Sequence, residues 1–125
     1  MAKNPVIWWE INAKDGGRLT EFYRDVFEWD CPLDEDSGIW EVDSAGGRPA
    51  AITGGIFTGK GRLPAHRCLY VEVEDIEEVT GRVEAKGLPI LQGPFEVGTG
   101  TRLAFFQDPE GHMIGLLQRA KKQAD

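Results

Sequence analysis

Cysteine and long apolar runs are both scarce in this sequence. Its 125 residues include two cysteines, Cys31 and Cys68, which are too few and too far apart to indicate a disulfide framework. No apolar stretch is long enough to cross a bilayer, and residues 1–5 lack the apolar segment of a secretory signal. We therefore expect a cytoplasmic protein with reduced thiols and no membrane partner.

Basic charge is also scarce. Lys and Arg total 14 against 21 Asp and Glu, which gives a formal net charge of −7, and only residues 119–122 concentrate positive charge. Because binding to phosphate backbones needs a basic surface, nucleic acid is not an expected partner. The charge balance favours a neutral or cationic small ligand, or else reflects solubility alone.

The first half of the chain alternates between strand and helix signals. Residues 6–11 are β-branched and aromatic and predict a strand. Asp15 is a suitable N-cap for a helix that runs to about residue 27. The apolar positions of this helix recur at helical spacing at Leu19, Phe22, Tyr23 and Val26. Three short strands are expected next, separated by turn-forming segments at 36–38 and 45–47, and they cover residues 29–33, 38–42 and 50–57.

The second half repeats this order. A strand at 67–73 precedes a helix at 76–86, for which Asp75 and Glu78 form a capping-box-like start and Gly87 a stop. The DPEG segment at 108–111 fits a type I turn before the final strand. The three strands after the helix are expected at 91–97, 102–107 and 113–118.

Equivalent residues of the two halves lie 60 positions apart. The matched pairs are Ile11 and Val71, Asp15 and Asp75, Leu19 and Val79, Tyr23 and Val83, Gly55 and Gly115, and Phe57 and Leu117. A constant offset through strand, helix and strand predicts an internal βαβββ repeat. We expect a single domain over 1–125, with one module at about 4–58, a second at about 66–118 and a tail at 119–125.

Four segments carry a family resemblance. They are VIWWEI at 6–11, FYRDVFEW at 22–29, YVEVEDI at 70–76 and FFQDPEG at 105–111. Over residues 4–118 the chain resembles the vicinal oxygen chelate superfamily of glyoxalases, bleomycin-resistance proteins and dioxygenases. The resemblance implies an α+β fold, the glyoxalase/bleomycin-resistance/dihydroxybiphenyl dioxygenase-like fold, with two βαβββ modules around a cupped sheet that is often completed by dimerisation. Glu28 departs from the family pattern, because glycine usually stands there, and we predict a left-handed backbone at this residue.

Many members of this superfamily hold a divalent metal through residues on the first and last strand of each module. The resemblance places these ligand positions at Trp8 and Cys68 on the first strands and at Gly55 and Gly115 on the last strands. Tryptophan and glycine side chains offer no metal ligand, and a thiolate suits such an oxygen-chelating site poorly. We therefore predict no metal and no other cofactor. His66, Cys68 and His112 are not expected to converge as an alternative metal site, because strand alternation separates them.

Alternation also predicts which strand residues face the cup. Ile7, Trp9, Ile11, Leu69, Val71, Val73, Ile114 and Leu116 are expected to face the helices. The expected cup face carries Val6, Trp8, Glu10, Gly55, Phe57, Cys68, Tyr70, Glu72, Met113, Gly115 and Leu117. We expect a ligand pocket formed by Trp8, Glu10, Phe57, Cys68, Tyr70 and Met113, since small-molecule pockets combine aromatic and a few polar groups. The same residues could instead simply fill the cleft.

Three functions fit these residues. The first is a metal-free protein that binds a small aromatic or hydrophobic molecule. The second is a metal-independent lyase or isomerase in which Glu10, partly desolvated by Trp8 and Tyr70, is the candidate general base. The third is an interaction module, for which Trp29 or Trp40 exposed in a patch would be the sign. A metal-dependent glyoxalase or dioxygenase is disfavoured. A homodimer is expected in each case, because a cupped apolar face needs a cover.

Overall fold

The computed structural model describes residues 4–43, 51–59, 61 and 63–120, and it divides them into two compact units. The N-terminal unit comprises Trp8–Cys68, and the C-terminal unit comprises residues 69–120 together with residues 4–7. Neither helix has the length and apolar character needed to cross a bilayer within these described residues. Each unit is described by itself below.

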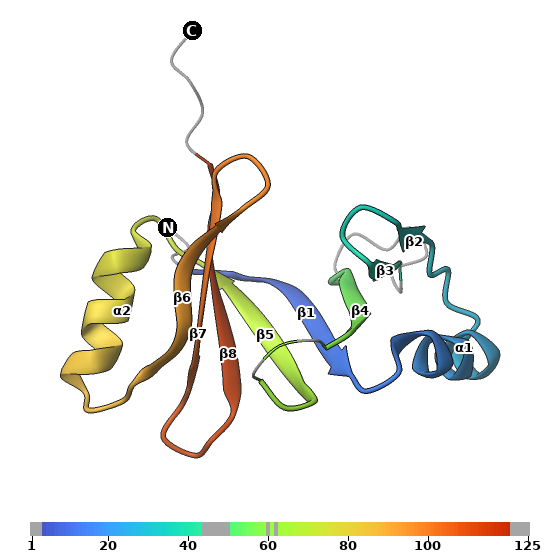
Figure 1. The fold of residues 1–125 in the computed structure, drawn as a ribbon, viewed down its shortest axis with the longest axis horizontal. Coiled ribbons are helices and arrows are strands. Elements are labelled where there is room, and N and C mark those ends of the chain that lie inside the picture. The colour runs from blue at the N-terminus through green and yellow to red at the C-terminus, as the bar shows by residue number, and fades with distance from the viewer. Residues whose placement is uncertain (1–3, 44–50, 60, 62, 121–125) are drawn as a thin grey trace, which may run out of the picture. The chain divides into compact units, whose positions relative to one another are not determined.

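The N-terminal unit contains a first helix and four strands. The elements are β1 (Val6–Ala13), α1 (Gly16–Phe27), β2 (Leu33–Asp34), β3 (Ile39–Val42) and β4 (Gly54–Thr58). Strand β1 extends beyond the unit at its start. The strands are ordered β2-β3-β4-β1, with β1 and β4 parallel and the other pairs antiparallel (Figure 1).

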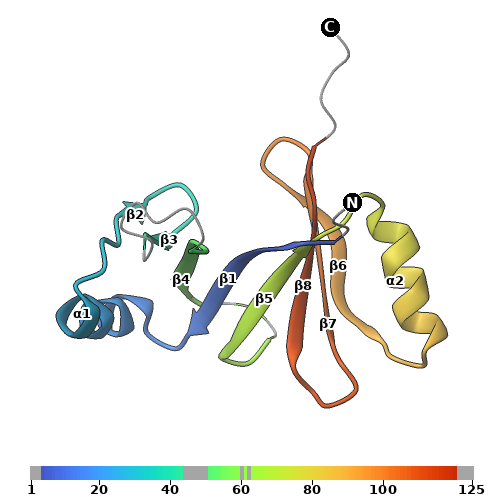
Figure 2. The ribbon, with the colours of Figure 1, turned by 180° about the vertical axis from the view of Figure 1, so that it is seen from behind.

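The C-terminal unit repeats this arrangement. It contains β5 (His66–Glu72), which begins within the N-terminal unit, α2 (Ile76–Ala85), β6 (Ile90–Val97), β7 (Thr101–Gln107) and β8 (Met113–Gln118). The strands are ordered β5-β8-β7-β6, and β5 and β8 are parallel. Figure 2 shows the same βαβββ order from behind. The predicted α+β fold of two βαβββ modules is therefore confirmed.

The two units also match in the register of their paired strands and in the hydrogen bonds at their helix starts. Glu10 pairs with Gly55 in the first unit and Tyr70 pairs with Gly115 in the second, which are the same positions 60 residues apart. The first backbone N–H of α1, at Gly16, is donated to Thr58 Oγ1 at 2.8 Å. The first N–H of α2, at Ile76, is donated to Gln118 Oε1, also at 2.8 Å.

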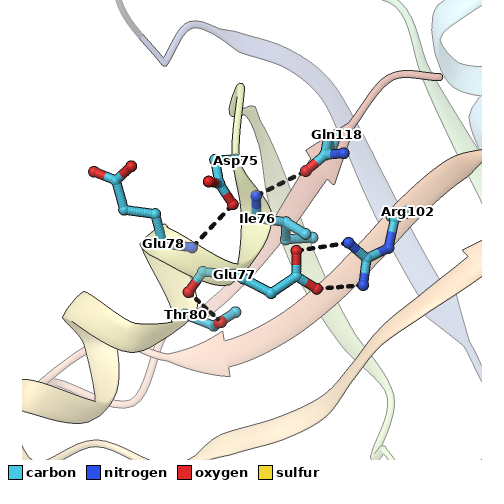
Figure 3. Close-up of polar contacts among 7 residues, drawn as sticks. All are labelled: Asp75, Ile76, Glu77, Glu78, Thr80, Arg102 and Gln118. Atoms are coloured by element: carbon cyan, nitrogen blue, oxygen red, sulfur yellow. Dashed lines mark hydrogen bonds and ion pairs between the residues drawn. The ribbon is translucent and has the colours of Figure 1, made fainter. Parts of the chain in front are cut away.

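Both predicted N-caps are confirmed. Asp15 accepts a hydrogen bond from the Arg18 backbone N–H, and Asp75 accepts one from that of Glu78. Each cap satisfies one of the N–H groups that a helix start leaves without an intrahelical partner. Figure 3 shows the start of α2, where Glu77 also binds the guanidinium of Arg102 on β7. This contact holds the pKa of the Glu77 carboxyl below its usual value.

Each unit has its own core. In the N-terminal unit, Ile56 and Val42 are fully buried beneath aromatic residues of β1, α1 and the segment that follows α1. The aromatic rings there form a connected group, with Tyr23 and Trp29 at 5.3 Å and Trp9 and Trp29 at 5.8 Å between centroids. In the C-terminal unit, Ile76 is fully buried among residues of β5, β7 and β8. The sheet faces predicted to pack against the helices do so at Trp9, Ile11, Val71, Val73, Ile114 and Leu116.

The predicted apolar face of α1 is partly wrong. Leu19 and Tyr23 pack against the core, but Phe22 is 56% exposed and Val26 is 52% exposed. The buried residues of the helix are Gly16 and Thr20 instead. The reason is close approach, because a Cβ at Gly16 would lie 2.8 Å from the Trp40 ring and 3.0 Å from the Phe57 carbonyl carbon. The helix therefore turns its smallest residues toward β3 and β4.

Three strand predictions also need correction. The segment at 29–33 is not a strand apart from Leu33, because Asp30 makes only an isolated bridge to Asp43. The strand predicted at 50–57 begins at Gly54. Leu69 is 49% exposed rather than packed beneath a helix, since the residues that pack with α2 come further along, at Val71 of β5 and at Val73 just after it. The turn predicted at 45–47 lies outside the described residues.

Glu28 ends α1 in the predicted left-handed conformation, with φ of 56° and ψ of 33°. Its backbone N–H still closes the last turn by bonding to the Arg24 carbonyl oxygen at 2.9 Å. A side chain bearing Cβ costs about 1 kcal/mol in this region, which is why glycine is common there.

Glu28→Gly is therefore expected to stabilise the protein by up to about 1 kcal/mol. Chemical denaturation of the two proteins measures the change directly. Gly87→Ala is the matched control, because Gly87 follows α2 with φ of +87° and its replacement should destabilise. A stability for Glu28→Gly at or below that of the parent would contradict the strain at residue 28.

Candidate functional site

The predicted pocket residues are divided between the two units. Trp8, Glu10, Phe57 and Cys68 belong to the N-terminal unit. Tyr70 and Met113 belong to the C-terminal unit. Trp8, beside Gly55, and Tyr70, beside Gly115, each lie on the sheet face opposite the helix of their unit.

In the N-terminal unit, the face opposite α1 brings an indole and a carboxylate together. Trp8 donates its Nε1–H to Glu10 Oε2 at 3.3 Å, and both side chains are half-buried. The Trp8 ring covers Gly55, since a Cβ at that glycine would lie 2.9 Å from Trp8 Cζ2. Ile39 of β3 closes the other side of Gly55 at 2.6 Å from the same Cβ position. This face is therefore an aromatic and aliphatic surface with one oriented carboxylate.

Glu41 is a further residue of this face that the sequence interpretation missed. It pairs with Gly55 from β3, while Glu10 pairs with Gly55 from β1. Directly paired residues point to the same side of a sheet, so two carboxylates flank one glycine. Alternation along residues 39–42, with Val42 buried, was the signal that could have identified it.

In the C-terminal unit, the equivalent face is filled by aromatic rings. Tyr70 and Phe105 flank Gly115 and pack edge to face, with centroids 5.7 Å apart. A Cβ at Gly115 would lie 3.0 Å from the Tyr70 ring and 3.2 Å from the Phe105 ring. Met113 is buried, at 7% exposure. Tyr70, Phe105 and Met113 therefore form an apolar surface where the first unit has Trp8, Glu10 and Glu41.

The residues at the superfamily's metal-ligand positions do not fit a metal. Gly55 and Gly115 are the two last-strand positions, and in both units a neighbouring ring occupies the space into which a carboxylate side chain would extend. Trp8 uses its only polar atom as a donor to Glu10. Among the described residues, no three His, Cys, Asp or Glu side chains are grouped as a metal site requires.

The environment of Cys31 does not activate its thiol as a nucleophile. Neither Cys31 nor Cys68 forms a disulfide bond, and both are buried. Burial raises the pKa of the Cys31 thiol, an effect that outweighs the opposing effect of the nearby Arg24 guanidinium. A thiol in this environment stays protonated and unreactive at neutral pH.

The sign expected of an interaction module is not found. Trp29 and Trp40 are half-buried and pack against the core of the N-terminal unit rather than forming an exposed patch. Their rings stabilise the packing of α1 and β3.

Known proteins share this arrangement. The family model described as the Glyoxalase/Bleomycin resistance protein/Dioxygenase superfamily matches residues 6–116. CFP32 of Mycobacterium bovis, which carries the name glyoxylase, is 25% identical over 115 residues, covering 89% of this chain and 44% of that protein. The anthracycline biosynthesis protein DnrV of Streptomyces peucetius is 25% identical over 118 residues, covering 83% of this chain and 43% of that protein. The chain thus spans less than half the length of these curated relatives.

Solved structures show the same fold. The hypothetical protein BH1468 from Bacillus halodurans matches with a TM-score of 0.66 and 16% identity, over 99% of each chain. A methylmalonyl-CoA epimerase matches with a TM-score of 0.61 and 18% identity, over 99% of this chain and 100% of that one. A superfamily member from Vibrio splendidus matches with a TM-score of 0.63 and 16% identity, over 94% and 100% of the two chains. The family match, the paired βαβββ units and the register of their strands establish that this chain belongs to the Glyoxalase/Bleomycin resistance protein/Dioxygenase superfamily.

Proposed function

We propose that this chain is a metal-independent member of its superfamily that binds a small aromatic or hydrophobic molecule on the face carrying Trp8, Glu10 and Phe57. The observation that carries the proposal is the Trp8 indole, which covers Gly55 and donates its N–H to Glu10. An aromatic ring with an oriented carboxylate beside it offers stacking area and one acceptor, which is what a small flat ligand needs. Cys68, which the sequence analysis assigned to the same pocket, lies on β5 within this unit.

A neutral flat probe tests this proposal. Binding of 1-naphthol, followed by tryptophan fluorescence, is expected to weaken about tenfold in Trp8→Ala, since burial against an indole contributes about 1–3 kcal/mol. Leu91→Ala is the matched control, because Leu91 is an exposed apolar residue of the other unit. Binding should be unchanged by EDTA. Loss of binding in EDTA, or equal binding by Trp8→Ala and the parent, would contradict the proposal.

A second candidate function is proton transfer by Glu10. It is supported by the half-buried position of this carboxylate and by its fixed orientation toward Trp8. Methylmalonyl-CoA, which is bound in the epimerase structure named above, carries an acidic C–H next to its thioester, so this compound in D₂O is a suitable test substrate. Deuterium incorporation detected by mass spectrometry, and abolished in Glu10→Gln, is the expected result. No incorporation above that of a blank would exclude this activity toward that thioester.

We also propose a homodimer. Val26 and Phe27, near the C-terminal end of α1, are 52% and 54% exposed. Neighbouring apolar side chains with this exposure favour association. Light scattering is expected to give twice the 13.9 kDa of one chain, and Phe27→Asp should lower the mass toward that of one chain. A parent mass near 13.9 kDa would contradict the dimer.

A further inference from the structure

A groove of about 820 Å³ lies in the N-terminal unit on the side of the sheet that carries α1. Its walls come from the end of β1, the first half of α1 and the start of β5, and every lining residue falls within Trp8–Cys68. This size is within the range of sites that hold small organic molecules. The groove shares no lining residue with the Trp8, Glu10 and Phe57 face, so it is a separate site.

The groove is basic in an acidic protein. Lys14, Arg18 and Arg67 line it, whereas Asp15 is the single acidic residue among the described residues of its lining. The Asp15 carboxylate already accepts the Arg18 backbone N–H as the helix cap. Within the described part of the chain, no carboxylate lies at ion-pair distance from the Arg18 or Arg67 guanidinium, although Arg82, Arg102 and Arg119 each have such a partner. Two arginines that have no ion-pair partner among the described residues thus line one concavity of a chain with net charge −7.

The wall formed by α1 is aromatic. Phe22 and Tyr23 line the groove and pack edge to face, with centroids 5.4 Å apart. Phe22 is 56% exposed, so its ring can accept a stacking partner. Phe22 follows Arg18 by four residues in α1, so the two side chains lie on the same side of the helix. The exposure of Phe22, which the sequence analysis did not predict, leaves its ring accessible there.

His66 adds a polar group of defined tautomer. Its Nδ1 lies 2.6 Å from the Pro64 carbonyl oxygen, and because a carbonyl oxygen only accepts, the proton of this bond is on Nδ1. The other ring nitrogen is then an acceptor in the neutral imidazole and a donor when the ring is charged.

We propose that this groove binds a small organic anion that carries a flat aromatic group. The anion is held by Arg18 and Arg67, with Lys14 adding positive charge, and the flat group stacks on Phe22. Charge-assisted hydrogen bonds from guanidinium to an anionic oxygen are among the stronger polar contacts in proteins. The charge balance of the whole sequence favoured a neutral or cationic ligand, but the local charge of the groove is opposite to that of the chain.

Phenyl phosphate tests the proposal, because it combines an anionic group for the arginines with an aromatic ring for Phe22. In NMR titrations its shift changes should be confined to amides of residues 11–23 and 65–67. Inorganic phosphate, which lacks the ring, and phenol, which lacks the charge, should each bind about tenfold more weakly, because each loses about 1.4 kcal/mol or more of contact. Affinity for phenyl phosphate should fall as salt is added.

Arg18→Gln and Arg67→Gln are the variants, and each is expected to weaken phenyl phosphate binding about tenfold. Lys86→Gln removes one positive charge at the end of α2 in the other unit and should leave binding unchanged. Both arginines are exposed, so an unchanged melting temperature will show that their loss affects binding only. Binding equal to that of the parent in both variants, or shift changes spread over the whole surface, overturns the proposal. Neither variant should alter 1-naphthol binding, so failure here is distinct from failure of the proposed function.

Discussion

Gly54→Ala is expected to destabilise the protein by about 2–3 kcal/mol or to prevent its folding. A Cβ at this position would lie 2.2 Å from Trp9 Cδ2 and 2.5 Å from the Trp9 carbonyl oxygen, which is backbone in the paired strand. The indole cannot swing away easily, because Trp9 Nε1–H is donated to the Ile52 carbonyl at 3.0 Å and the ring packs on Trp29. Urea denaturation measures the loss.

The matched control for this substitution is Gly81→Ala in the interior of α2. Apart from its chain neighbours and the backbone of α2 itself, no atom of the described residues lies within 4 Å of its Cβ position, so alanine adds helix propensity without a steric clash. This variant should be more stable than the parent by about 0.5–1 kcal/mol. Equal stabilities of the Gly54 and Gly81 variants would show that the sheet can move apart near Trp9.

Thr58→Val and Gln118→Met should each destabilise the protein by about 1–3 kcal/mol. These substitutions keep the size of the side chain but remove the oxygen that accepts the first N–H of α1 or of α2. Gly16 and Ile76, which carry those N–H groups, are buried, so water cannot easily replace the lost acceptor. Figure 3 shows the Gln118 contact.

Thr53→Val and Gln92→Met serve as controls for these two substitutions. Both residues are exposed, and their changes should stay within about 0.5 kcal/mol of the parent. Because the two tested bonds are equivalent in the repeat, a loss in only one variant would show that the two units use their helix starts differently. The change in unfolding free energy is measured from the midpoint of urea denaturation, provided that the dependence of this free energy on urea concentration is the same in variant and parent.

The repeat, the helix caps and most of the strand faces could be predicted from the sequence alone. Asp15, Asp75 and Gly87 act on backbone groups within a few residues, and alternation fixes the side of a strand, so both could be predicted from neighbours in the chain. The left-handed conformation of Glu28 was predicted from the family resemblance instead, because glycine usually stands at this position in the superfamily.

Which distant residues come into contact depends on how the strands and helices pack, and the sequence did not reveal it. Glu41 shares Gly55 with Glu10 because of the register of β3 and β4, and residue periodicity does not encode register. Similarly, Phe22 is exposed because Gly16 allows α1 to approach Trp40 and β4, a contact between segments more than 20 residues apart. The basic groove follows from that helix orientation, since Arg18 and Arg67 lie in segments joined only by packing.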